Sequence, residues 1–443
     1  MTATAVQPYI DLFGRLESGM PGGRLPWLAE RRRAGLERFR DTGFPSVKAE
    51  AWKYTNLRPL ESLSFDLAAP SPPTVGIDRL PTVMPAGESA YRLVFVDGAP
   101  RPDLGLTSGL PVGVVLMSLG EALEKEPALL EEYLGRVAPV EDGKPLAALN
   151  TAFLADGAVL RLPKGVVLDK PVELLFLATG ADRPLVWHPR LLIVAETLSE
   201  ATIVEHHVGL GGGTYFANSV TEVVARGGAR LRHYKLQREG AGAFHVATVA
   251  ARLERDVDYS SFVLAMGAKL ARHEACVTLD GPGINAHVSA GYLVRDSQHC
   301  DITTVIDHAQ PHGSSRQVCK GVLDDTARAV FQGKIVVRPG AQKTDGYQIN
   351  RALLLSEKAE VDTKPELEIY ADDVKCSHGA TAGELDDDAL FYLRARGIDR
   401  DTARGLLIGA FLGEALEEVG VEVVRNAFAA QVEGWLAARE AKL

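Results

Sequence analysis

The sequence predicts a mainly β fold, in which stacked short strands form a solenoid between two helical ends. From about residue 90 to 380 apolar and polar residues alternate with period two, as in Tyr91–Val96 and Val330–Val337, and this alternation is typical of strands. Almost no helical pattern interrupts the strands after residue 150, which excludes an architecture of alternating strands and helices. Small residues followed by polar ones recur at the turns, which favours a repeating fold.

The recurring turns also give a spacing for the solenoid. Ala327, Ala341 and Ala359 each stand before a polar residue at the start of a new strand, and they are 14 and 18 residues apart. This spacing predicts one short rung, with each strand stacking in register on the next. A β-sandwich is the alternative, but its hairpins should be rich in Asn-Gly and Asp-Gly turns, which are scarce here.

Both ends of the chain are predicted to be helical. Residues 1–60 carry apolar positions on one helical face, and the proline-rich tract Ala69–Pro73 is predicted to be a linker or an extended surface segment. Near the C-terminus, Asp386 opens a run of aspartates that suits a helix start, and Gly397 suits a helix end. We therefore expect an N-terminal helical region with a linker (1–89), a β-helix core (90–384) and a C-terminal helical domain (385–443).

Charge and hydropathy argue against several classes of function. The formal net charge of the 443 residues is −10, which disfavours a nucleic-acid scaffold because phosphate binding needs surplus Lys and Arg. No run approaches the roughly 20 apolar residues that span a bilayer, and residues 1–14 lack the pattern of a secretory signal. We expect a cytoplasmic protein with no nucleic-acid and no membrane partner.

The four cysteines, Cys276, Cys300, Cys319 and Cys376, include no C-x-x-C pair. A zinc ribbon or a self-contained iron–sulfur site needs clustered ligands. Taken singly, each cysteine is therefore expected to be a small buried hydrophobic residue.

Motifs for nucleotide binding and catalysis are missing. No G-x-x-x-x-G-K-[ST] loop occurs, so the sequence offers no phosphate cradle for ATP. The glycine-rich run Gly209–Gly213 lacks the spacing of a dinucleotide fingerprint, and neither the zinc-protease helix nor the G-x-S-x-G elbow is present. We expect a protein that is not an enzyme.

The segment Lys375–Gly379 favours metal chemistry. Cys376 and His378 are two residues apart, so in a strand they project from the same face, about 6.6–7 Å apart along the chain. A thiolate and an imidazole suit iron and zinc. Two ligands are too few for a closed site, so a second chain or inorganic sulfide would have to supply the rest.

Three segments resemble a known family. The run from Lys375 to Ile398, KCSHGATAGELDDDALFYLRARGI, closely resembles the C-terminal signature of the SufB/SufD family of iron–sulfur cluster assembly scaffolds, and of its SufD branch in particular. Glu50–Leu57 resembles the family's N-terminal motif, and Pro339–Asp345 resembles its late solenoid turn. The three segments lie on both flanks and in the core, so the resemblance spans essentially the whole chain.

The resemblance implies a right-handed parallel β-helix between helical domains. It also implies a complex with a homologous SufB-type subunit and two copies of a SufC-type ATPase docked on the terminal helices, so that ATP acts only through the ATPase. The family's interface cysteine and histidine map onto Cys376 and His378, which would hold a transient iron–sulfur cluster between subunits, with His378 the better supported. Use of a flavin by the complex stays open.

Apolar residues of the predicted C-terminal helices are candidates for docking the ATPase. They exceed what a small appended bundle must bury, and large apolar side chains are typical anchors of interfaces. The candidates are Leu406, Leu407, Phe411 and Leu416.

Two other functions remain as alternatives. A pure adaptor would join the SufB-type and SufC-type partners without a metal ligand of its own. A β-helix enzyme acting on polysaccharides would share the solenoid, but it needs a signal peptide and a groove of paired carboxylates or basic residues. The dense charged cluster of the later strands, Asp324, Asp325 and Arg328, is better explained as a solvated turn.

Overall fold

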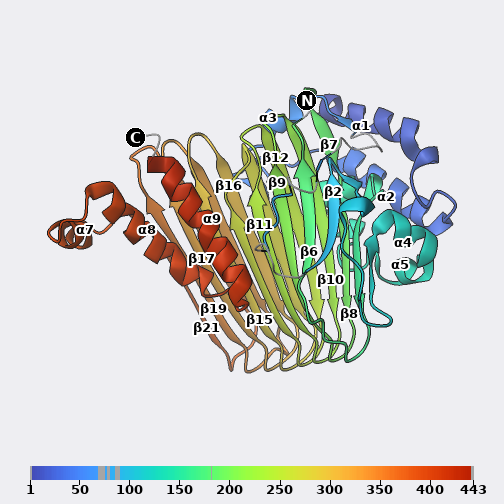
Figure 1. The fold of residues 1–443 in the computed structure, drawn as a ribbon. Coiled ribbons are helices and arrows are strands. Elements are labelled where there is room, and N and C mark those ends of the chain that lie inside the picture. The colour runs from blue at the N-terminus through green and yellow to red at the C-terminus, as the bar shows by residue number, and fades with distance from the viewer. Residues whose placement is uncertain (1, 68–74, 77–79, 85–89, 181, 441–443) are drawn as a thin grey trace.

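The chain forms a β-solenoid of about eight turns with helices at both ends (Figure 1), which confirms the predicted fold class. The computed structural model describes residues 2–67, 75–76, 80–84, 90–180 and 182–440. The predicted linker, Ala69–Pro73, lies outside the described residues.

Helices occur at the two ends and in one group beside the first rungs. The helices are α1 (Thr2–Leu16), α2 (Pro26–Thr42), α3 (Arg58–Glu61), α4 (Leu119–Lys125), α5 (Pro127–Tyr133), α6 (Pro145–Ala152), α7 (Asp387–Arg394), α8 (Arg400–Leu416) and α9 (Glu422–Glu440), with short 3₁₀ turns η1 (Glu17–Gly19), η2 (Glu50–Trp52), η4 (Pro102–Leu104) and η5 (Val140–Asp142). Helices α4 to α6 lie inside the range 90–384 that was expected to form the β-helix core. The division into three units stays a prediction.

Two sheets form the two long faces of the solenoid. Sheet A consists of β4 (Val115–Ser118), β5 (Gly157–Leu162), β8 (Arg190–Ala195), β10 (Tyr215–Ala225), β12 (Ala243–Leu253), β14 (Leu270–Leu279), β16 (His299–His308), β18 (Arg328–Val337) and β20 (Glu360–Ile369), with β7 (Leu185–Trp187) beside β10 and β1 (Asp66–Leu67) beside β7. Sheet B consists of β3 (Ala99–Pro100), β2 (Tyr91–Val96), β6 (Val172–Ala178), β9 (Glu200–Gly209), β11 (Arg230–Arg238), β13 (Asp258–Ala265), β15 (Asn285–Val294), β17 (Ser314–Leu323), β19 (Asp345–Leu354) and β21 (Lys375–Gly383).

Strands of successive rungs stack in parallel and in register. Leu231 of β11 pairs with Ala201 of β9 on one side and with Tyr259 of β13 on the other. All three side chains belong to the core between the sheets, because alternate residues of a strand point to opposite faces. Inward side chains of neighbouring rungs therefore line up in columns along the solenoid.

One rung takes about 30 residues, so the rung predicted from the 14- and 18-residue spacing is wrong. Residues with positive φ mark the same turn in successive rungs: Leu198, Gly228, Asp256 and Gly283 follow one another at 30, 28 and 27 residues. The chain reverses twice in every rung, once at each edge of the solenoid. The turn pattern in the sequence therefore repeats every half rung.

Helices cover the outer faces of both sheets (Figure 1). On sheet B, Ile408 of α8 and Phe428 of α9 are fully buried with Tyr234 and Phe262 of the strands. On sheet A, the N-terminal helices pack an aromatic core against the first rungs. Its members are Tyr9, Phe13, Phe39, Phe44, Phe153, Phe216 and Phe244.

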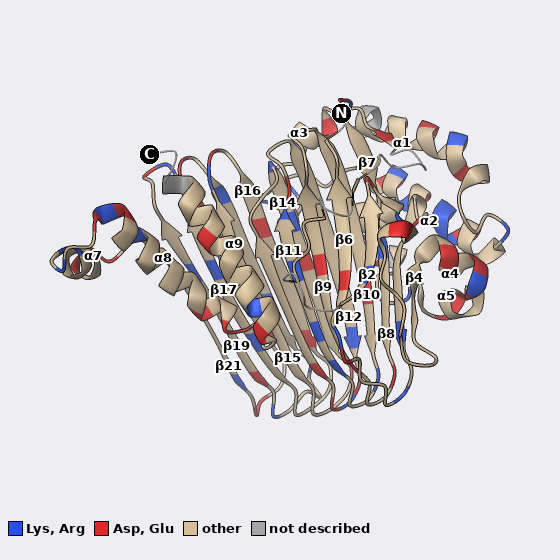
Figure 2. Ribbon diagram, viewed as in Figure 1, with Lys and Arg blue, Asp and Glu red and all other residues tan. Residues whose placement is uncertain are grey.

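Acidic and basic residues are interspersed along the lower turns of the solenoid (Figure 2). Within the described part of the chain, no helix has both the length and the apolar character needed to cross a membrane.

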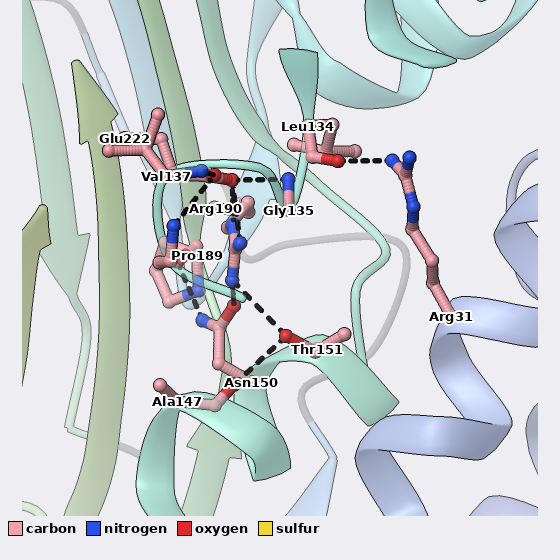
Figure 3. A network of polar contacts seen from close by, with 11 residues as sticks. Arg31, Leu134, Gly135, Val137, Ala147, Asn150, Thr151, Pro189, Arg190 and Glu222 are labelled. Atoms are coloured by element: carbon pink, nitrogen blue, oxygen red, sulfur yellow. Dashed lines mark hydrogen bonds and ion pairs between the residues drawn. The ribbon is translucent and has the colours of Figure 1, made fainter. Parts of the chain in front are cut away.

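A buried ion pair joins the helices beside the first rungs to sheet A (Figure 3). Arg190 of β8 and Glu222 of β10 are fully buried, with Nη2 and Oε1 2.6 Å apart. Glu222 also accepts the backbone N–H groups of Gly135 and Val137, which follow α5, at 2.7 and 2.9 Å. Arg190 donates from Nη1 to the Asn150 Oδ1 of α6 at 3.2 Å. One ion pair thus links the loop after α5, helix α6 and two neighbouring strands.

The carboxylate of Glu222 is charged in the folded protein. Burial would raise its pKa, but Arg190 and the backbone donors hold the pKa below its ordinary value. Both carboxylate oxygens are hydrogen-bonded, so the cost of burying the charge is offset only while the whole network is intact.

The substitution Glu222→Ala should therefore destabilise the protein by about 3–5 kcal/mol, because it leaves the buried Arg190 guanidinium without its counter-ion. Urea unfolding measures the loss. Glu200→Ala is the matched control, because Glu200 pairs with Arg230 at 3.0 Å while their side chains are 39% and 61% exposed, and an exposed pair contributes about 1 kcal/mol or less. Equal losses for the two variants would contradict this role of the buried pair.

Candidate functional site

The solenoid ends in an uncovered rung made of β20 and β21 (Figure 1). β20 pairs with β18 and β21 pairs with β19, and among the described residues neither strand has a neighbour on its other side. Every residue of β21 is exposed or half-buried, whereas β17 of the same sheet is mostly buried. Unpaired N–H and C=O groups at such an edge are free to pair with another strand.

The two candidate metal ligands lie on the inward face of this last rung. Cys376 is aligned with Gly346 of β19, and His378 is aligned with Gln348. His378 is exposed, and no described residue hydrogen-bonds to its ring. The structure thus brings the pair together on one face of one strand, at the open end of the solenoid.

Cys376 is half-buried among apolar side chains. It packs with Ile335 and Val337 of β18, and a Cβ atom added to Gly346 would lie 3.3 Å from its Sγ. Burial raises the pKa of the thiol. Metals bind the thiolate, so a raised thiol pKa disfavours metal binding at Cys376.

The ligand set at the open end is incomplete. Within the part of the chain that the structure describes, no group of three or more His, Cys, Asp or Glu side chains could hold a metal ion. A cluster bound at Cys376 and His378 would therefore need further ligands from outside the chain.

The other three cysteines lie elsewhere. Cys300 and Cys319 are 1% and 2% exposed within an apolar cluster, as expected of buried hydrophobic residues. Cys276 is half-buried on the outer face of sheet A, with Lys144 Nζ 2.8 Å from its Sγ. All four cysteines are free thiols.

The candidate docking residues of α8 differ in exposure. Leu406 is 52% exposed, and it lines a groove of 450 Å³ between α8 and α9 together with Gly405, Gly409 and Leu436. Leu407 is half-buried.

Two of the candidates pack inside the chain. Phe411 packs partly against the core beneath the helices. Leu416 is only 6% exposed and belongs to that core, so its assignment to a partner surface is wrong: α8 lies along the solenoid and buries this residue itself.

The N-terminal motif Glu50–Leu57 packs against the outer face of the later rungs. The Trp52 ring lies 4.1 Å from the Arg272 guanidinium, and Thr55 and Arg272 both bond to the buried Asp301. Lys364 of β20 reaches Glu50 at 2.7 Å. A segment from the start of the chain thus supports the rungs that lead to the open end.

Two family models match the chain. Residues 176–411 match the model described as "SUF system FeS cluster assembly, SufBD core domain", and residues 3–174 match the model described as "SufBD protein N-terminal region". The chain belongs to the SufBD family. This family is one of iron–sulfur cluster assembly proteins, which leaves the polysaccharide-active alternative without support.

Individual relatives match over most of their length. An iron–sulfur cluster assembly SufBD family protein of Synechocystis is 34% identical over 407 residues, which cover 88% of this chain and 87% of that protein. The iron–sulfur cluster assembly protein SufD of Escherichia coli is 32% identical over 399 residues, 90% of each chain. The SufD protein of Bacillus subtilis is 28% identical over 422 residues, 92% of this chain and 93% of that protein.

A buried ionic cluster inside this SufBD-family solenoid was missed from the sequence. Glu205 of β9 lies at its centre, with His207 Nε2 at 3.1 Å, His233 Nε2 at 2.7 Å and Lys235 Nζ at 3.7 Å. The sequence pattern that could have predicted this cluster is a spacing of two residues, between Glu205 and His207 and between His233 and Lys235. This spacing puts all four side chains on one face of their strands.

A second pair adjoins this cluster. His245 Nδ1 of β12 lies 2.8 Å from Glu239 Oε2, and the rings of His207 and His245 are 4.8 Å apart. Burial would raise the pKa of Glu239, but His245 lowers it to about 2. Burial lowers the pKa of His207 to about 3. The folded chain therefore keeps the carboxylate charged and the His207 imidazole neutral.

Acidification should destabilise the protein well above the pH at which carboxylates titrate. Burial lowers the pKa of His188, His206 and His207 to about 3, whereas an unfolded histidine takes up its proton near 6.5. Between these values the unfolded chain binds more protons, so stability is lost as the pH falls below about 6.5. Each such histidine lowers the free energy of unfolding by about 1.4 kcal/mol for every pH unit below 6.5.

Urea unfolding at about pH 7.5 and about pH 5.5 measures this slope. His207→Gln should flatten it, because one buried base is removed while an amide can still donate to Glu205. His312→Gln is the control, because His312 is exposed in a turn. A stability that is the same at both pH values would refute the prediction.

Proposed function

We propose that this SufBD-family chain is a cytoplasmic scaffold subunit on which iron–sulfur clusters are assembled, and that it is not itself an enzyme. The proposed partners are a homologous SufB-type subunit and a SufC-type ATPase. One observation carries the proposal. The solenoid leaves its last rung open, and that rung holds His378 and Cys376 on its inward face.

The open rung suits another solenoid of the same kind. The edges of β20 and β21 offer backbone groups for strand addition, and a homologous chain would present strands of the same spacing. The last residues of β21 are small: Gly379, Ala380, Thr381, Ala382 and Gly383. Small side chains let a neighbouring backbone and its side chains approach closely. The two subunits would then enclose the cluster ligands at their seam.

Within this seam His378 would supply a ring nitrogen to iron, and Cys376 would assist it. The cluster is cargo, so further ligands would come from the SufB-type subunit and from inorganic sulfide. The thiol of Cys376 would have to lose its proton on binding, which its burial among apolar groups opposes. The proposal therefore rests mainly on the exposed imidazole of His378.

The substitution His378→Ala should lower the cluster content of the assembled complex about tenfold. Loss of a residue that only hydrogen-bonds to a metal ligand already lowers metal affinity by about tenfold or more, and loss of the ligand itself should lower it at least as much. Assembly should be unaffected, since one exposed imidazole adds little to a large contact. Gel filtration and iron content are measured on the same preparation.

Ser377→Ala is the matched control, because Ser377 is exposed on the opposite face of the same strand. Normal cluster content with normal assembly in His378→Ala would favour the pure adaptor, which holds both partners without a metal ligand of its own.

The C-terminal helices are the proposed docking site of the ATPase. Leu406 stands exposed in the groove between α8 and α9, and Phe391 and Tyr392 of α7 are 73% and 56% exposed. Helix α7 has no buried residue. Large apolar side chains left uncovered in this way are typical of a binding surface.

Leu406→Asp should weaken binding of the ATPase by about tenfold or more, because a central apolar anchor typically contributes ~2 kcal/mol. Titration calorimetry with the purified ATPase measures the change. Val112→Asp is the control, since Val112 is 98% exposed in a loop at the other end of the chain. A point substitution is preferable to truncation, because loss of α8 and α9 would uncover Tyr234 and Phe262. Undiminished affinity of Leu406→Asp would remove α8 from the proposed surface.

A further inference from the structure

A column of polar side chains leads through the interior to the open rung. Gln317 of β17, Gln348 of β19 and His378 of β21 are aligned in register on the inward face of sheet B. Gln317 and Gln348 are 1% and 0% exposed, so His378 is the only member of this column at the surface. Amides buried in a solenoid interior are costly unless their polar atoms are bonded.

The hydrogen bonds of this column fix the direction of the Gln348 amide. Thr304 of β16 donates from Oγ1 to Gln317 Oε1 at 2.6 Å, and Gln348 donates from Nε2 to the same oxygen at 3.4 Å. The nitrogen of the Gln348 amide therefore faces β17. The other terminal atom of this amide, Gln348 Oε1, therefore points away from Gln317.

This oxygen lacks a hydrogen bond. Gln348 Oε1 is buried without a partner among the described residues. A buried acceptor left unpaired costs about 1–3 kcal/mol. The aligned residue on the remaining side of Gln348 is His378, and neighbouring strands lie about 4.8 Å apart, a gap that a glutamine and a histidine side chain together span.

Sheet A leaves space in the interior for the Gln348 amide. Gly333 of β18 faces the Gln348 amide, and a Cβ atom there would lie 1.9 Å from Gln348 Nε2. Only a glycine at position 333 allows the amide to lie across the interior in this position. The amide is therefore held on both sides, by the bond to Gln317 and by the backbone of β18.

We propose that Gln348 is a positioning residue for His378, an inference that rests on the proposed role of His378 as a cluster ligand. The structure itself has no hydrogen bond between the two side chains; a change of the His378 rotamer brings one ring N–H to Gln348 Oε1 and fills the unpaired acceptor. The bond fixes one neutral tautomer and directs the other ring nitrogen out of the open end. Ligand histidines are commonly oriented in this way by a carbonyl or carboxylate oxygen that accepts from the second nitrogen.

Nitrogen NMR of the full-length chain, labelled with ¹⁵N in its histidines, tests the inference without any cluster present. The ring signals of His378 are identified by their loss in His378→Gln. In the unsubstituted chain they should show one dominant neutral tautomer. Gln348→Met keeps the length of the side chain but removes the oxygen, and it should give a mixture of both tautomers.

Two variants make the outcome specific. Gln348→Glu retains an acceptor oxygen and should restore the single tautomer. Asn350→Leu is the matched control, because Asn350 also has a buried unpaired oxygen but is aligned with Ala380 instead of His378; it should leave the tautomer unchanged. If Gln348→Met leaves the His378 signals unchanged, the free oxygen belongs to a buried water and the inference is overturned.

Failure of this inference is distinguishable from failure of the proposed function. The tautomer reports on the bond between Gln348 and His378 in the chain alone, whereas the cluster content of His378→Ala reports on the ligand role. If both hold, Gln348→Met should also lower the cluster content of the complex several-fold while Asn350→Leu does not. A changed tautomer with unchanged cluster content would contradict the positioning role.

Discussion

The register of the stacked strands is the constraint on which the rest of the structure depends. Each inward residue lies directly beside the inward residues of the rungs before and after it, as Leu231 lies between Ala201 and Tyr259. A shift of one residue would turn every inward side chain outward. Register therefore decides together the apolar core, the ionic cluster around Glu205 and the column that ends at His378.

A stack of parallel strands has two ends, and this chain treats them differently. At the first rungs the stack is closed by the antiparallel strands β3 and β4 and by helices held through Arg190 and Glu222. The last rung has no such cover among the described residues. Helices α8 and α9 lie on the outer face of sheet B rather than over this end. An open edge of this kind is unfavourable in a monomer, and it is the feature that makes a partner subunit the expected cover.

The interior is more polar than the architecture requires. Charged groups around Glu205 lie in the middle rungs, and buried amides lie in the rungs behind His378. Apolar replacements would often be equally or more stable at buried ionic sites. The ionic cluster is largely satisfied by its own members, whereas Gln348 keeps an unpaired oxygen beside the open end. The unpaired oxygen of Gln348 thus lies one strand away from the last rung, where a group on β21 can approach it.

The sequence alone determined the local structure, because period-two alternation and helix-capping residues act over a few neighbours. It therefore predicted the solenoid, the helical ends and the shared face of Cys376 and His378. Rung length, the burial of Leu416 and the alignment of Gln348 with His378 depend on which distant strands become neighbours. No local pattern encodes that choice. Only the tertiary structure decided these features, because stacking brings together residues that are about 30 positions apart.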